Sequence, residues 1–204
     1  MKKIIFIALC LVSVQGFAQH EKKAVHTANG YYGGITTTFS SFNKQNAWML
    51  GGQAGWLINH KLMLGLAGYA TITRHPGFGV NTATNSRNQL RMGYGGLMVE
   101  YIFGGDRDQT FYITANTFVG AGTVSNGYKK TYEHGDNGEQ WRKVGKSGFF
   151  IVQPGIAVEA RLTDWYRISL GGGYRYISGA KLDGITNKTM SAPTASLTMK
   201  FGLF

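Results

Sequence analysis

The sequence predicts an all-β fold, an eight-stranded antiparallel up-and-down β-barrel that crosses a membrane. Three observations predict it: apolar and polar residues alternate with a period of two, the links between the predicted strands alternate between short and long, and charged residues are scarce. Charged residues make up 15% of the 204 residues, against about 25% in ordinary soluble domains. A surface other than a charged, water-facing one must therefore cover much of the molecule.

The N-terminus predicts an export signal. Lys2 and Lys3 precede a short apolar stretch at residues 4–14, and small residues then lead to Ala18, after which we expect cleavage. The stretch is shorter than the roughly 20 residues of a membrane-spanning helix. Cys10, the only cysteine, could instead carry a lipid anchor. We expect residues 1–18 to be a signal peptide, 19–29 a short lead and 30–204 the barrel.

Period-two alternation predicts the strands. It is clearest at the C-terminus, where Leu197, Met199 and Phe201 share one face and Thr198 and Lys200 the other. Each predicted strand reaches the 9 to 11 residues, approximately, that a tilted strand needs to cross a bilayer. The predicted strands are residues 30–39, 48–58, 62–73, 89–103, 110–121, 149–162, 166–177 and 191–204.

The predicted links differ systematically in length. Those after the second, fourth and sixth strands are short, whereas those after the first, third, fifth and seventh are longer and polar, the longest being residues 74–88 and 122–148. A membrane barrel has short turns at one end and long loops at the other. The dipeptides Asn126-Gly127 and Asn137-Gly138 favour turns within the longest link.

The polar face of the strands fits a narrow lumen, and the apolar face fits lipid. In the strand at residues 110–121 the assignment stays open, because Tyr112 and Phe118 lie opposite Phe111 and Val119. Charges inside a narrow lumen are costly unless they are paired, so we expect either a network of ion pairs or a weakly conducting pore. The predicted luminal charges are Glu100, Glu159, Arg161, Arg167, Arg175 and Lys200.

Together these features resemble the small eight-stranded outer-membrane barrels, the family that includes the barrel domain of outer-membrane protein A and its smaller relative X. The resemblance covers residues 30–204 and includes aromatic residues near strand ends, at Trp48, Trp56, Tyr101, Phe103, Trp165 and Tyr166, and a final Phe204. It implies a monomer in the bacterial outer membrane. It also implies that Phe204 is an assembly signal for the barrel-assembly machinery.

The predicted function is a non-enzymatic barrel with basic surface loops that interact with outer-membrane lipid and lipopolysaccharide. The protein's net charge of +11 is spread along the chain, which argues against nucleic-acid binding. A narrow channel is the alternative function. The basic loop residues are Arg74, Arg87, Lys129, Lys130, Arg142, Lys143 and Lys146.

An enzyme that modifies lipid A is a further alternative. The segment from Tyr176 to Ala180 is similar to the His-x-Ser-Asn region of the lipid A 3-O-deacylases, but Tyr176 replaces the histidine and Gly179 the asparagine, so Ser178 has no adjacent base. Oxygen ligands at residues 133–139 could bind a divalent cation, but they lack the full calcium-loop pattern. We therefore expect no catalytic residues, no metal and no cofactor.

Overall fold

The computed structural model describes residues 30–42, 45–73, 75–81, 86–104, 110–130, 140–182 and 185–204. The described residues form one antiparallel sheet of nine strands and a short helix. The elements are β1 (Gly30–Phe42), β2 (Gln45–Ile58), β3 (Leu62–Thr71), β4 (His75–Asn81), β5 (Ser86–Phe103), β6 (Phe111–Lys130), β7 (Gln140–Arg161), β8 (Tyr166–Ser178), α2 (Asn187–Met190) and β9 (Ala192–Leu203). No described helix is long and apolar enough to cross a membrane.

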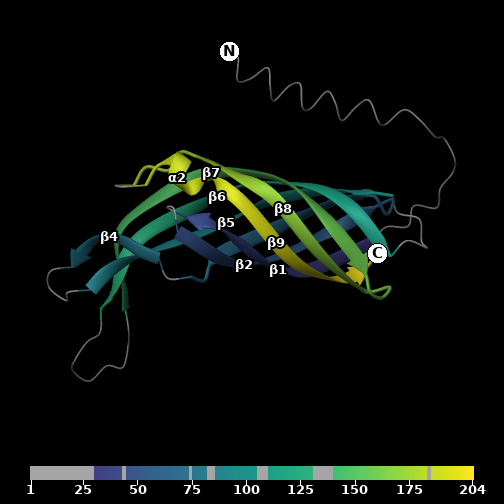
Figure 1. Ribbon diagram of the computed structural model, residues 1–204, viewed down its shortest axis with the longest axis horizontal. Coiled ribbons are helices and arrows are strands. Elements are labelled where there is room, and N and C mark those ends of the chain that lie inside the picture. The colour runs from purple at the N-terminus through teal and green to yellow at the C-terminus, as the bar shows by residue number, and fades with distance from the viewer. Residues whose placement is uncertain are drawn as a thin grey trace, which may run out of the picture.

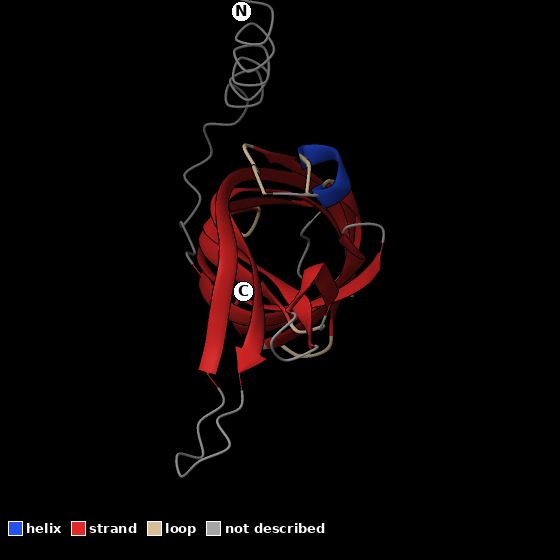
Figure 2. Ribbon diagram, turned by 90° about the vertical axis from the view of Figure 1, so that its left-hand side faces the viewer, coloured by secondary structure: helices blue, strands red, loops and turns tan. Residues whose placement is uncertain are grey.

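The sheet closes into a barrel because its first and last strands pair. β1 pairs with both β2 and β9, and β3 pairs with β5 across the remaining gap. β3 and β4 pair with successive parts of β5, so together they occupy one of eight positions around the barrel. Figure 2 shows the resulting ring. The predicted eight-stranded up-and-down barrel is confirmed.

The barrel has two different ends. One, which we call the turn end, carries the tight turn at Asn59–Lys61, the turn at 162–165 and Phe204. Asn59 and His60 both have positive φ, the conformation that a two-residue hairpin turn requires. The other, which we call the loop end, carries α2 and the tips of β6 and β7 (Figure 1).

Two long links predicted from the sequence are largely strand. β4 lies within residues 74–88, and β6 and β7 stay paired as far as Lys130 and Gln140. Asn126-Gly127, which the sequence predicted to be a turn, instead lies at a shift of register in the β6–β7 ladder. A bulge accommodates such a dipeptide without ending the strand, so the prediction of a loop at 122–148 was wrong for most of its length.

The segment between β8 and β9 contains α2, a single helical turn that the sequence did not predict. Thr186 caps it: its side chain accepts a hydrogen bond from the backbone of Thr189, while the Thr189 side chain accepts one from the backbone of Thr186. Met190, at the end of this turn, is fully buried. The segment therefore packs onto the barrel at the loop end (Figure 2).

The outer face of the strands is largely apolar. On β8, Leu170 is 67% exposed whereas Ser169 beside it is 6% exposed. The open question at residues 110–121 is also answered, because Tyr112 and Phe118 are buried in the lumen while Phe111 and Val119 face outward. An apolar outer surface with a filled, partly polar interior is the arrangement expected of a small barrel in a bilayer.

Candidate functional site

Four charged residues meet inside the lumen near the turn end. Glu100 lies on β5, Glu159 on β7, Arg167 on β8 and Lys200 on β9. Each faces inward because side chains alternate across a strand, and Arg167 is paired directly with Lys200 in the β8–β9 register. All four are at least nine-tenths buried.

These residues form the ion-pair cluster. The Lys200 ammonium lies 2.5 Å from a carboxylate oxygen of Glu100 and 2.5 Å from one of Glu159. The other Glu159 oxygen accepts a hydrogen bond of 3.1 Å from the Arg167 guanidinium. Two carboxylates thus balance two cations, which is the condition under which charges removed from water are tolerated. The cluster links four of the eight barrel positions.

Arg175 was predicted to join this network, but the structure places it elsewhere. It lies eight residues further along β8, at the loop end, and is fully buried. Its guanidinium donates to the backbone carbonyls of Ser41 at 2.7 Å and Met190 at 3.1 Å, and to the sulfur of Met49 at 3.3 Å. All three acceptors are neutral. Arg175 therefore connects β1, β2 and the end of α2.

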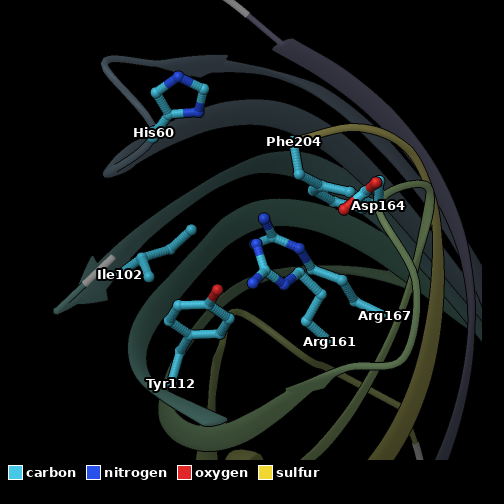
Figure 3. Close-up of a pocket in the computed structure, with 7 residues that line it drawn as sticks. All are labelled: His60, Ile102, Tyr112, Arg161, Asp164, Arg167 and Phe204. Carbon is cyan, nitrogen blue, oxygen red and sulfur yellow. The ribbon is translucent and has the colours of Figure 1, made fainter. Parts of the chain in front are cut away.

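Arg161 is also separate from the three ion pairs. It is only half-buried and lines a cavity of about 320 Å³ at the turn end, which we call the turn-end pocket. The guanidinium groups of Arg161 and Arg167 both reach into it (Figure 3). The residues lining the pocket are His60, Ile102, Tyr112, Arg161, Asp164, Arg167 and Phe204.

Phe204, predicted to be an assembly signal, turns inward. Its ring stacks on Tyr32 with centroids 5.8 Å apart, and the Arg167 guanidinium carbon lies 3.9 Å from its centroid. The flanking Leu203 is instead 56% exposed on the outer face. Nothing in this geometry bears on recognition by the assembly machinery, which stays a prediction.

The loop-end half of the lumen is filled by aromatic and methionine side chains. The rings of Tyr69, Tyr94 and Phe118 contact one another with centroids 5.2 to 5.7 Å apart. Beyond them lie Met49 and Met92, which are almost completely buried. We call the side chains that fill this half of the lumen the apolar plug. Its members are Phe42, Met49, Tyr69, Leu90, Met92, Tyr94, Phe118, Val124, Ile151, Ile177 and Met190.

A small polar cavity separates the ion-pair cluster from the apolar plug. Its volume is about 40 Å³, and Thr36, Gln53 and Thr198 are among its lining residues. In liquid water, one molecule occupies about 30 Å³. The cavity is therefore of the size of one or two water molecules.

Sequence reasoning missed the apolar plug, although a signal for it was present. On β5, Leu90, Met92, Tyr94 and Met98 have the same parity as Glu100, so they had to share its inward face. The prediction treated the lumen as mainly small and polar. Large side chains fill it because an eight-stranded interior is wide enough to be packed.

The basic residues assigned to loops lie mainly on strands. Lys129 and Lys130 end β6, Arg142, Lys143 and Lys146 belong to β7, and Arg87 belongs to β5. Lys146 is exposed. Arg74 lies outside the described residues, as do the N-terminal 29 residues and the candidate cation ligands at 133–139. Among the residues with defined positions, no three histidine, cysteine or acidic side chains are grouped to hold a metal.

Comparison with known proteins bears on the fold. Neisserial surface protein A superposes with a TM-score of 0.52 at 13% identity, covering 88% of this chain and 99% of that one. A major outer-membrane protein from Thermus thermophilus gives 0.52 at 12% identity, covering 86% and 100%. The chain has the fold of the small eight-stranded outer-membrane barrels. No family model and no curated protein matches its sequence.

The outer-membrane barrel fold agrees with the location that the sequence predicts. The solved structures cover nearly all of their own length in the superposition, so the shared part is the complete barrel. At this low identity they inform the fold alone. A functional assignment for this chain must come from its own lumen and ends.

Proposed function

We propose that the protein is a non-enzymatic integral outer-membrane barrel whose lumen is closed. It anchors the β6–β7 tips and α2 at its loop end without conducting solutes. The observation that carries the proposal is the filled lumen. The ion-pair cluster occupies one half, the apolar plug the other, and the cavity between them is about 40 Å³. A hydrated ion would have to displace packed side chains from both halves.

Conductance across planar bilayers tests closure directly. We expect the wild-type protein to give no discrete single-channel steps. Replacing Tyr94 and Phe118 with alanine hollows the plug and should produce steps or raise the leak. Phe111→Ala is the matched control, since Phe111 lies on the outer face of the same strand as Phe118. Steps in the wild type equal to those of the hollowed variant would favour the narrow channel.

The loop end is the part that we propose to interact with the cell surface. β6 and β7 extend past the rest of the barrel there (Figure 1), and the extension carries Lys129, Lys130, Arg142 and Lys143. Lysine and arginine bind phosphate and carboxylate groups by charge-assisted hydrogen bonds. The proposed partner is the anionic inner core of lipopolysaccharide in the surrounding leaflet.

Binding to vesicles that contain lipopolysaccharide tests this proposal. Changing the four basic residues to glutamine should weaken binding at low salt and flatten its salt dependence, because screening acts on the same charges. Lys181 and Lys188, exposed on the segment between β8 and β9, provide a control for lost charge at the same end. Equal loss in the control and the quadruple variant would count against a specific role for the hairpin.

A further inference from the structure

Two cations lie on the outer wall of the barrel near the loop end. On β7, every outward-facing residue from Ala160 to Phe150 is apolar, and Lys146 is the first outward-facing charge beyond them. On β5, the outward residues from Phe103 to Gly93 are apolar, aromatic or glycine, and Arg91 follows. A tilted strand needs about ten residues to rise about 25 Å, the height of the apolar band of such barrels. Both cations therefore lie at the level of the lipid head groups.

Arg91 and Lys146 belong to one row of the sheet. Arg91 pairs with Ser125 on β6, and Ser125 pairs with Lys146 on β7. The inward neighbours Val124 and Ser147 are buried, so this row faces outward. Two strand spacings of about 4.8 Å separate the Cα atoms of the two cations by roughly 10 Å. A phosphate above Ser125 would lie within reach of both long side chains. We call Arg91, Ser125 and Lys146 the basic row.

No acidic side chain among the described residues offsets the basic row. Glu100 and Glu159 lie in the lumen, and Asp164 lies at the turn end. None of the ion pairs between described residues involves Lys146. Arg91 has an interaction within the protein, but a guanidinium carries five donors and can serve more than one partner. The basic row thus offers positive charge to an anionic head group.

Small residues cover the outer face directly below the basic row, on the side of the turn end. The next row consists of Gly93, Thr123 and Gly148, and the row after it of Gly95, Ala121 and Phe150. Phe150 is 74% exposed, so its ring stands above these neighbours. A hydrocarbon chain that lies over β6 would contact Thr123 and Ala121 and have the Phe150 ring at its side.

Packing within the barrel does not account for the outward glycines. A Cβ added to Gly93, Gly95 or Gly148 would approach no atom closer than 3.5 Å. The inward glycines of the same sheet differ, because a Cβ added to Gly96 or Gly122 would collide with a backbone carbonyl oxygen of a neighbouring strand. The inward glycines are required by the fold. The space over the outward ones is available to a molecule outside the chain.

We propose that this face of β5, β6 and β7 binds one lipid A moiety of lipopolysaccharide, with a phosphate on the basic row and an acyl chain over the small residues beside Phe150. The loop end faces outward in the orientation expected for such barrels, and lipopolysaccharide is the phosphorylated lipid of the outer leaflet. The inference rests on the proposed contact with lipopolysaccharide. It gives the lipid part a place on the wall, whereas the β6–β7 hairpin was assigned the inner core.

Native mass spectrometry of the full barrel in detergent micelles counts bound lipids and tests the site. The probes are diphosphoryl lipid A, its dephosphorylated form and phosphatidylglycerol. We expect one molecule of diphosphoryl lipid A, bound at least about tenfold more tightly than the dephosphorylated form, as expected for charge-assisted hydrogen bonds. Equal binding of the two forms would overturn the role of the basic row. Equal binding of phosphatidylglycerol would overturn the assignment to lipid A.

Charge variants test the basic row. Lys146→Gln should weaken diphosphoryl lipid A about tenfold, the effect of losing one charge-assisted contact. Lys181→Gln is the matched control, because Lys181 is also exposed near the loop end but lies outside the row. It should bind like the wild type. Equal affinity in the two variants would assign any binding to general surface charge and contradict the proposal.

Glycine variants test the place of the acyl chain. Gly95→Leu fills the space below the basic row, and we expect about threefold weaker binding or more, because the chain then loses contact area. Gly172→Leu is the matched control, since Gly172 faces outward on β8 and a Cβ there approaches no atom closer than 3.7 Å. Unchanged affinity in Gly95→Leu would contradict this placement. Heat-modifiable migration on gels verifies that each variant has folded.

One further variant separates this site from the hairpin. Replacing Lys129, Lys130, Arg142 and Lys143 with glutamine should leave the binding of lipid A unchanged, because lipid A lacks the core sugars. If this quadruple variant also binds complete lipopolysaccharide normally, the hairpin proposal fails while the site on the wall stands. If it loses lipid A as strongly as Lys146→Gln does, the lipid belongs to the hairpin and the site on the wall is overturned.

Discussion

The two halves of the lumen are filled by side chains of opposite chemistry. Near the turn end, the interior is held by Lys200 between Glu100 and Glu159, with Arg167 on the same carboxylate. Near the loop end the interior is held by the apolar plug. Among the described residues of this half, Arg175 is the one buried cation, and it donates to neutral atoms. The first half depends on charge balance and the second on volume. They should therefore respond differently to substitution.

The largest expected effect is at the centre of the ion-pair cluster. Glu159→Gln removes the negative charge that Lys200 and Arg167 share, so two buried cations are left with one carboxylate. Breaking a buried pair in this way costs about 3 to 5 kcal/mol. Urea unfolding of the barrel in lipid vesicles measures the change. Gln153→Asn, on the same strand, provides the control, because it alters a luminal side chain without changing the charge. A loss below that of the control would contradict a cluster held by charge balance.

On the outer face, the cost of a substitution should depend on its depth in the bilayer and not on which half of the lumen lies behind it. Leu170 lies on the middle part of β8 and is 67% exposed on the outer surface. Arginine at the bilayer midplane of such barrels costs about 2 to 4 kcal/mol and much less near the interfaces. Leu170→Arg should therefore destabilise the barrel more than Leu203→Arg, close to the turn end. Vesicle unfolding experiments on both variants make the comparison, and equal losses would place Leu170 outside the bilayer centre.

The sequence predicted the fold well because the period-two pattern depends only on whether a side chain faces lipid or the lumen. Outward-facing residues such as Leu170 and Val158 had to be apolar in lipid, and the pattern records that requirement. The same pattern identified the inward faces of Glu100 and Glu159. It could not identify partners, because residues as far apart in the chain as Glu100 and Lys200 meet only through the barrel's closure and strand register.

Arg175 shows where this reasoning stops. Its parity placed it in the lumen correctly, but it lies eight residues along β8 from Arg167, at the opposite end of that strand, and one of its acceptors belongs to a helix that the sequence did not reveal. α2 arises from a capping interaction between Thr186 and Thr189, in a stretch too short for periodicity to detect. The carbonyl of Met190 at its end then provides the acceptor that Arg175 needs. Such contacts arise only when tertiary structure brings the segments together.

A smaller effect is expected in the apolar plug, because packing tolerates changes that preserve volume. Met92 is 2% exposed in the loop-end half. Met92→Leu should cost less than about 1.5 kcal/mol, as is usual for swaps of similar volume. Glu159→Asp is the matched conservative change in the other half, and it should cost more because a shorter carboxylate cannot reach both cations. The unfolding free energies of Met92→Leu and Glu159→Asp test this order. A costlier Met92→Leu would show that the plug is as exacting as the cluster.

The smallest effect belongs to the cap on the loop end. Thr186→Ala removes a capping side chain from α2, a loss typically of about 1 kcal/mol, and α2 is only one turn long. Because the eight barrel positions are paired without α2, opening of this segment should be local. Hydrogen exchange should therefore speed up at the amides that this segment protects, Ile177, Ala180 and Ser191, while Lys200 and its neighbours on β9 exchange as before. Thr186→Ser retains the hydroxyl and serves as the control. If exchange also accelerated around the ion-pair cluster, the two halves would be coupled, and the lumen would act as a single cooperative core.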